Sequence, residues 1–301
     1  MNNIHHFYAS YPDHNDGRRS PLAEYAATKP RSTRRPSHPS SDRWFHWLLG
    51  AVCFGYVLFL ASMTASLAGY TSPLRVVEIL TRPAIAHSLW LTLWASTVAT
   101  VAAMLVAIPI GYLMGRARFF GQGVVDNILD IPNVFPPMVL GLALLTLFQY
   151  PPLRQLSPSI VYQVPAILLV YFVVAISFSL PVLRTTFKEL DPRLENVALT
   201  LGCSRFGAFL KVAIPEARYG LFSAAITAWS RCFGCFGPLL VFAGATRNKT
   251  EVLATSVYLE LGGGEIDGAV AASLFMIAVA GLVLSVSRWL TRHYQHRRSE
   301  G

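Results

Sequence analysis

Charged side chains are scarce in this sequence. Only 14% of its 301 residues are charged, whereas soluble domains carry about 25%. Hydrophobic residues make up 53% of the chain, and the mean hydropathy is positive, at +0.44. The length alone would suit two soluble domains, but this composition argues against them and predicts a membrane protein.

Cysteine is also rare, which excludes a fold held together by disulfide bonds. Of the four cysteines, Cys203 lies in a mostly polar stretch, and the other three lie in apolar segments. Cys232 and Cys235 form a C-x-x-C pair, but no second pair of ligands lies nearby. Inside an apolar span such a pair is more typical of small packing residues than of a redox or metal site.

No catalytic or nucleotide-binding pattern is found. The stretch GATRNKTE, residues 244–251, comes nearest to the phosphate-loop pattern G-x-x-x-x-G-K-[ST], but Asn248 stands where the second glycine must be. A Ser/His/Asp or metal-ligand arrangement is likewise missing. We therefore predict that the chain is not an enzyme and binds no cofactor or metal of its own.

The first 43 residues differ from the rest of the chain. They are rich in proline, serine, arginine and histidine and show no apolar periodicity. This composition predicts a disordered basic tail. It is not typical of a secretory signal, because the first apolar run begins too late. Residues 44–299 form the predicted membrane domain.

Six segments are candidates for membrane spans, each of which needs about 20 apolar residues. The third is short, and we expect it to extend back through residues 128–135, broken by Pro132, Pro136 and Pro137. The six segments cover residues 47–68, 87–114, 136–148, 164–183, 219–243 and 269–289.

The basic residues predict the orientation of these spans. Most of the 25 lysines and arginines fall in the tail, in residues 116–118 and 184–218, and at the C-terminus, which six spans would place on one side. By the positive-inside rule, both termini and the 184–218 segment are predicted to be cytosolic. The positive charge is then an orientation signal, so we expect a lipid bilayer and not nucleic acid as its partner.

The 184–218 segment has the pattern of two short helices. Asp191 and Pro192 favour a helix start, Gly202 favours a C-terminal cap, and Ser204 favours a second start. Pro215 is expected to close the second helix. Apolar residues at helical spacing predict a stripe against the membrane surface. They are Leu190, Leu194, Val197, Ala198 and Leu201 in the first helix and Phe206, Phe209, Leu210 and Ala213 in the second.

Three roles fit this helix pair: an amphipathic loop resting on lipid, a DNA-binding helix-turn-helix, or a docking element for a cytosolic partner. The DNA-binding role is disfavoured because the spans on either side leave the helices little room to enter a groove.

The segment resembles the cytoplasmic EAA loop of ABC importer permeases, whose pattern is E-A-A, three residues, G, nine residues, I-x-L-P. Residues 196–198 (Asn-Val-Ala) occupy the E-A-A positions, and the carboxylate stands one place early, at Glu195. In that family the loop is the coupling helix, which seats on a separate ATPase subunit. The resemblance implies such a role for Glu195, Asn196, Val197, Ala198, Gly202 and Pro215.

Three further stretches resemble molybdate- and sulfate-type permeases: FPPMVLGLALLTLF (135–148), SLPVLRTTFKELDP (179–192) and RCFGCFGPLLVFAGATRNKTEVLATSVYLEL (231–261). Cys235 stands where that family has glutamate. The glycines around Cys235 predict a kink, or else close helix packing of the kind expected for Gly111 and Gly115. Arg231 is alone within a span and could face the solute or anchor the helix. The predicted pathway or gate residues are Arg231, Cys235, Gly234, Gly237 and Pro137.

The resemblance implies an all-α integral membrane protein, a six-span permease of the ABC importer type I fold in the inner (plasma) membrane. A homodimer would join two ABC ATPase subunits, which bind ATP and Mg, and an extracytoplasmic solute-binding protein. A tetrahedral oxyanion such as molybdate, tungstate or sulfate is the expected solute. The alternatives are another solute, such as ferric ion or a polyamine, and a secondary transporter driven by an ion gradient.

Overall fold

The computed structural model describes residues 39–117 and 119–299, and every regular element in that part of the chain is helical. The chain divides into two units, residues 1–60 and 61–301. Helix α2 (Pro39–Tyr70) begins in the first unit, inside the segment predicted as a tail, and ends in the second. The disorder predicted for residues 1–38 lies outside the described residues.

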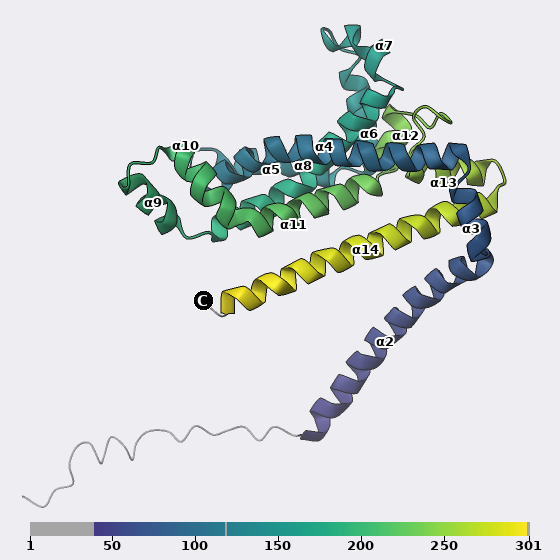
Figure 1. Ribbon diagram of the computed structural model, residues 1–301, viewed down its shortest axis with the longest axis horizontal. Helices are drawn as coiled ribbons and strands as arrows, with labels where there is room; N and C mark the ends of the chain where they lie inside the picture. Colours follow the sequence, from purple (N-terminus) through teal and green to yellow (C-terminus); the bar gives the residue numbers. More distant parts are fainter. Residues whose placement is uncertain (1–38, 118, 300–301) are drawn as a thin grey trace, which may run out of the picture. The chain divides into compact units, whose positions relative to one another are not determined.

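The second unit is a bundle of long helices joined by short ones (Figure 1). The long helices follow the predicted apolar segments. After α2 the elements are α3 (Pro73–Leu80), α4 (Pro83–Arg116), α5 (Gln122–Val134), α6 (Pro137–Leu147), η1 (Leu153–Gln155), α7 (Ser157–Ile160), α8 (Val164–Glu189), α9 (Pro192–Thr200), α10 (Arg205–Ala208), η2 (Phe209–Ala213), α11 (Ile214–Phe233), α12 (Gly237–Phe242), α13 (Leu253–Gly262) and α14 (Ile266–Ser299).

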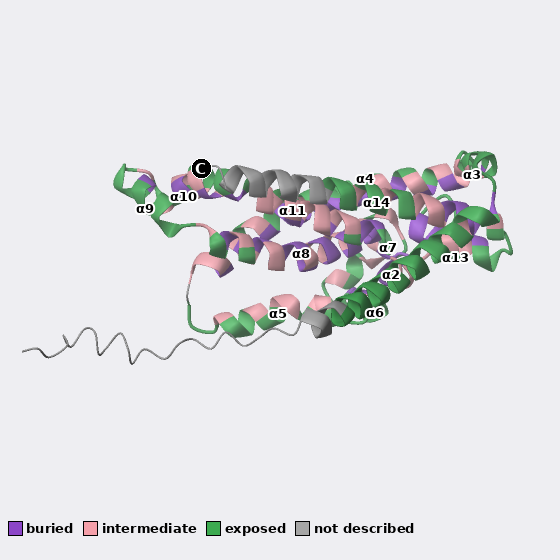
Figure 2. Ribbon diagram, turned by 90° about the horizontal axis from the view of Figure 1, so that it is seen from below, coloured by how far each residue is buried: buried purple, intermediate pink, exposed green. Residues whose placement is uncertain are grey.

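Helix α8 lies at the centre of this unit. Over its 18 most apolar consecutive residues 56% are buried, compared with 33% for α4 and 22% for α14. Both α4 and α11 pack along it, and Figure 2 shows the buried residues concentrated where these helices meet. Tyr171 and Phe187 of α8 are among the largest fully enclosed side chains.

Small residues allow α4 to approach α8 closely. Alanines at every fourth position of α4, from Ala95 to Ala107, are buried, and Gly111 and Gly115 continue the series. A Cβ atom added to Gly111 would lie only 2.7 Å from the Cβ of Leu183 on α8. The packing role predicted for the two glycines is therefore confirmed, because contact at this distance requires the absence of a side chain.

Four of the expected spans are single apolar helices long enough to cross a membrane: 44–70 in α2, α4, α8 and 266–286 in α14. The third expected span is two helices, α5 and α6, which meet at an angle of 109°. Its break lies at residues 135–136. Pro132 lies inside α5, two residues before its end, and does not break it, contrary to the prediction.

The fifth expected span is interrupted. Helix α11 ends at Phe233, and the chain resumes helical geometry at Gly237, so the kink predicted from the local glycines is confirmed. Neither α11 nor α12 alone is both long and apolar enough to count as a span. The described helices provide four spans, or five if the bent pair is one, and the count of six remains a prediction.

Candidate functional site

The helix pair α9–α10 forms as the sequence predicts. The Asp191 side chain accepts a hydrogen bond of 2.9 Å from the backbone N–H of Arg193, and Ser204 accepts one of 3.0 Å from Gly207. Between the helices Gly202 has φ = +89°, in the left-handed region that other residues enter only with strain. Two caps and a glycine bend therefore fix the shape of this loop.

Most of the apolar side chains predicted to form a stripe on this loop are exposed. Ala198 is the only residue of α9 that is buried, while Leu201 is 80% exposed and Phe206 on α10 is 70% exposed. We call the exposed set the loop surface; its members are Leu194, Val197, Leu201, Phe206 and Leu210.

A single carboxylate ties the loop to the bundle. Glu195 accepts a hydrogen bond of 2.6 Å from the Tyr112 hydroxyl and forms an ion pair of 2.7 Å with Arg116, both near the end of α4. Arg116 also donates a 2.8 Å hydrogen bond to the Leu190 carbonyl. The Glu195 and Arg116 side chains are only 14% and 15% exposed, so this anchor is largely shielded from solvent.

Pro215 does not close a helix. The chain continues from α10 through the π-helical turn η2 directly into α11, and Pro215 lies in the first turn of α11. A π turn bonds residues five apart, so it relieves the clash between a proline ring and the preceding turn. The prediction of a closing proline was therefore wrong, and α10, η2 and α11 form one continuous helical segment.

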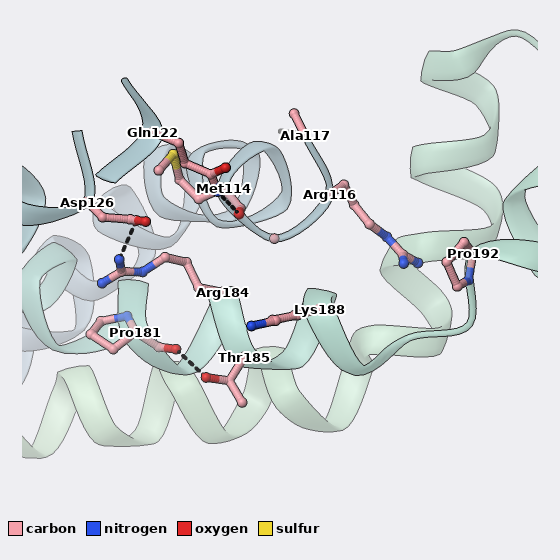
Figure 3. A pocket seen from close by; sticks show the side chains of 11 residues that line it. Met114, Arg116, Ala117, Gln122, Asp126, Pro181, Arg184, Thr185, Lys188 and Pro192 are labelled. Atoms are coloured by element: carbon pink, nitrogen blue, oxygen red, sulfur yellow. Dashed lines mark hydrogen bonds and ion pairs between the residues drawn. The ribbon is translucent and has the colours of Figure 1, made fainter. Parts of the chain in front are cut away.

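A cavity of about 840 Å³ lies beside this loop, bounded by α4, α5 and α8. Figure 3 shows Arg184 reaching from α8 to Asp126 of α5, where the two form an ion pair of 2.5 Å. Arg184 is also paired with Asp130. Lys188, one turn further along α8, lines the same cavity and has no ion-pair partner among the described residues.

The predicted pathway residues are only partly brought together. Pro137 at the start of α6 and Gly237 at the start of α12 are in contact, since a Cβ added to Gly237 would lie 3.1 Å from the Cβ of Pro137. Gly234 is exposed and Cys235 is buried, and both lie in the interruption between α11 and α12. The two interrupted helices thus meet at their breaks.

Arg231 lies apart from that contact. Its guanidinium group stacks 4.7 Å from the centre of the Phe178 ring on α8, and the residue is exposed. Among the described residues it has no ion-pair partner. Cys232 is fully buried, with its thiol directed at the Tyr171 carbonyl 3.2 Å away. Within the described part of the chain no group of three or more metal-binding side chains includes either cysteine.

A polar cluster lies in the connection between α12 and α13, at the opposite end of the bundle from α9 and α10 (Figure 1). Arg247 forms an ion pair of 2.9 Å with Glu260. Glu251 is fully buried, and neither of its carboxylate oxygens has a hydrogen-bond partner of good geometry within the described residues. Burial raises the pKa of Glu251 above its ordinary value of 4.5, although the nearby Arg247 charge opposes that rise.

Sequence reasoning missed the partners of the loop and of α5. Tyr112 and Arg116 lie about 80 residues before Glu195, and nothing local to either segment predicts that they meet. One signal was present: the carboxylate stands at Glu195 instead of at position 196, and Asn196 is exposed. A carboxylate one position away on a helix points about 100° further round, here towards α4.

The features described so far define a class: a helical, multi-span membrane protein with two interrupted helices in contact and a capped two-helix loop at one end. The chain belongs to the family of binding-protein-dependent transport system inner membrane components, whose model matches residues 107–300. It is therefore a membrane permease subunit of the ABC importer type.

Individual relatives agree with this placement. The chain is 31% identical to the molybdate/tungstate transport system permease protein WtpB of Pyrococcus furiosus, over 69% of this chain and 79% of the relative. It is 27% identical to the sulfate transport system permease protein CysT of Escherichia coli K12, over 77% and 85% of the two chains. A chain of a bacterial alginate ABC transporter, solved in complex with an alginate-bound periplasmic protein, shares the fold with a TM-score of 0.66 at 18% identity, over 86% and 98%.

Proposed function

We propose that this chain is the permease subunit of an ATP-driven importer for a tetrahedral oxyanion such as molybdate, tungstate or sulfate. The names of the relatives supply the solute class. Two copies of the chain, two ABC ATPase subunits that hold ATP and Mg, and an extracytoplasmic solute-binding protein complete the proposed assembly.

The observation that carries this proposal is the α9–α10 loop. It is shaped by two side-chain caps and the Gly202 bend, and Glu195 anchors it to α4. Its loop surface presents apolar side chains that the chain itself leaves uncovered. To seat in the groove of another protein, a helix needs to be held firmly by its own chain and to expose apolar side chains towards the groove. We assign that groove to the ATPase.

We further propose that the solute passes beside the interrupted helices. Pro137 and Gly237 bring the two breaks into contact, and Gly234 and Cys235 lie in the second break. Irregular backbone is tolerated at membrane depth where it borders a cavity or packs within protein. Arg231, in the last turn of α11 just before the second break, supplies a positive charge that would attract a dianion towards this region.

The test is solute uptake by a loop variant. Cells lacking their own molybdate and sulfate importers would express this chain with a candidate ABC ATPase and solute-binding protein, and uptake of each radiolabelled anion would be measured. In Gly202→Val the side chain would be forced into the left-handed region at a cost of about 1–2 kcal/mol. We expect the variant to insert in the membrane but to lose uptake and the ATPase stimulation that loaded binding protein produces.

The matched control is Gly262→Val. Gly262 also has open space around it, but its backbone does not have positive φ, and it lies at the end of α13. This variant should retain uptake. Normal uptake and normal ATPase stimulation in Gly202→Val would contradict the docking role of the loop, and failure of the wild-type system to import either anion would contradict the proposed solute.

A further inference from the structure

Helix α5 is held to α8 by polar side chains. Arg184 of α8 pairs with both Asp126 and Asp130, and the Asn133 side-chain amide donates a 2.8 Å hydrogen bond to the Ser177 carbonyl. The three α5 residues are spaced four and three positions apart, so they share one face of the helix. Arg184 alone contributes two of these three attachments.

Apart from these contacts, α5 has one more side-chain attachment: the Gln122 amide at its start donates a 2.9 Å hydrogen bond to the Met114 carbonyl of α4. None of the residues of α5 is buried, and its other face leaves Val124, Ile128, Ile131 and Val134 exposed. It is flanked by Gly121, which has φ = +84°, and by the 109° bend that precedes α6. Elements with few buried contacts are the ones that open at low free energy. The cavity of about 840 Å³ between α4, α5 and α8 gives such a movement room.

The attachment point of α5 lies close to the loop. Arg184 is in the last turns of α8, which ends at Glu189, immediately before α9. The carbonyl of Leu190, between the two helices, is bonded to Arg116. A displacement of α9 therefore acts directly on the end of α8 that carries Arg184. At its other end, the α5–α6 pair reaches the second helix break, because Pro137 contacts Gly237.

We propose that Arg184 is a positioning residue for transport: it fastens the α5–α6 arm to the end of α8, so that movement of the α9–α10 loop is transmitted to the arm and to the helix breaks. That this movement serves transport rests on the proposed function. The ion pairs suit a reversible fastening, because the Arg184, Asp126 and Asp130 side chains are 17%, 33% and 43% exposed. Water can replace each partner as the pair separates, which a fully buried pair would not allow.

The first experiment measures the arm directly in the purified full chain in nanodiscs. Spin labels would be placed at Val124→Cys on α5 and Glu189→Cys on α8, both exposed, and their separation measured by double electron–electron resonance. Arg184→Gln should broaden the distance distribution or shift it to longer distances. The background variant would lack the native cysteines, Cys53, Cys203, Cys232 and Cys235.

Two further variants make the result specific. Lys188→Gln removes a positive charge one turn away from the same cavity and should leave the distances as in the wild type. The exchange of Arg184→Asp with Asp130→Arg places opposite charges on the two helices again and should restore a narrow distribution. Wild-type distances in Arg184→Gln would overturn the proposal, as would an exchange variant that folds, by its thermal unfolding profile, yet stays broad.

The second experiment asks whether the fastening serves transport. In the uptake assay described above, Arg184→Gln should lower uptake by about fivefold or more, the lower end of ordinary coupling between sites, while ATP hydrolysis continues. Lys188→Gln should not. If the wild type imports neither anion, the proposed function fails, but the measured distances still decide the role of Arg184. Unchanged uptake in Arg184→Gln, where the wild type does import, would overturn the proposal.

Discussion

Glu195 makes two contacts, each of which alone would stabilise the loop only modestly. It receives the Tyr112 hydroxyl and the Arg116 guanidinium at ordinary distances, in a place where both charged side chains are mostly enclosed. Because enclosure removes water as an alternative partner, loss of the charge leaves Arg116 poorly compensated. The stability of the loop should therefore depend on this one carboxylate.

Glu195→Gln keeps the size of the side chain and removes its charge. We expect the free energy of unfolding to fall by about 1–3 kcal/mol, as for other hydrogen bonds to charged groups. Thermal unfolding of the purified chain in detergent measures the change. Glu189→Gln, at an exposed position on the last turn of α8, is the control and should unfold as the wild type does. Equal unfolding temperatures for both variants would show that the anchor contributes nothing.

Arg231 should be reached by water-soluble reagents if it borders the pathway. A central arginine costs about 2.5–3.5 kcal/mol on membrane insertion, which a purely lipid-facing position would not offset. In a background without Cys53, Cys203, Cys232 and Cys235, we expect Arg231→Cys to react with a charged thiol reagent in at least one nucleotide state. Phe178→Cys, opposite it on α8, offers a comparison. Absence of labelling in every state would identify Arg231 as a structural anchor.

Glu251 should make the free energy of unfolding depend on pH. Its pKa in the folded chain is raised by burial, and secondarily by Glu260, while Arg247, the Asn248 backbone N–H and His87 oppose the rise. The unfolded chain releases this proton near pH 4.5, and the folded chain releases it at a higher pH. Over that interval the folded state binds more protons, so the free energy of unfolding falls as pH rises.

Glu251→Gln should remove this dependence. At pH values below 4.5 the variant and the wild type should be similarly stable, and above the interval the variant should be the more stable of the two. Thermal unfolding measured from acidic to neutral pH tests this, with Glu265→Gln, exposed near the same end, as the control. A wild-type chain that gains stability over the same rise in pH, relative to the variant, would reverse the sign and refute the assignment.

At the scale of helices, the parts determined by neighbouring residues were predictable. The caps at Asp191 and Ser204 and the bend at Gly202 depend on side chains within three positions, and all three formed as expected. The prolines were harder, because whether a proline ends a helix depends on the turn before it. Pro132 and Pro215 both lie inside helical segments, and a π turn accommodates the second.

Contacts between helices that are distant in the chain could not be predicted from the sequence. Arg184 and Asp126 are 58 residues apart, and neither segment carries a local feature that selects the other as a partner. The alanine series of α4 can be read from the sequence, but small residues indicate only that another helix packs closely, and not which helix it is. The apolar spacing of α9 likewise predicts a face but does not say what covers it, and within this chain that face is exposed.

The close approach of α4 and α8 makes a direct prediction. Gly111→Val would place a side chain where even a Cβ atom lies 2.7 Å from Leu183, so the helices must separate. Overpacking of this kind lowers the free energy of unfolding by about 1–3 kcal/mol. Thermal unfolding in detergent measures it, and Gly123→Val, on α5 with open space around it, is the matched control. A similar small loss in both variants would mean that helix propensity, and not packing, explains the effect.

At the scale of the whole molecule, orientation in the membrane is the property that the charges predict. Within the second unit, the C-terminal end of α14 lies towards the same end as α9 and α10 (Figure 1). This arrangement agrees with the predicted common cytosolic side of the C-terminus and the 184–218 segment. The relatives are membrane transport permeases.

Reporter fusions test the orientation. A fluorescent protein fused after residue 299 should fluoresce, and alkaline phosphatase at the same point should be inactive, because basic flanks are retained in the cytosol. Phosphatase inserted after Lys249, in the connection predicted to lie outside, should be active. The opposite pair of activities would show that the chain is inverted relative to the prediction.

The continuity of α10, η2 and α11 has a geometric consequence. From Arg205 to Phe233 the chain forms one helical rod, about 40 Å long at 1.5 Å per residue. Each residue along such a rod turns the next side chain by about 100°, so the π turn sets the angle between Phe206 of the loop surface, on α10, and Arg231 at the far end. Deleting one residue from 209–213 would rotate one end against the other by about 100° without changing the sequence of either. The number of residues between the two ends therefore determines the angle between their side chains. Insertions or deletions in this turn are a route by which a permease of this kind could be adapted to a different partner.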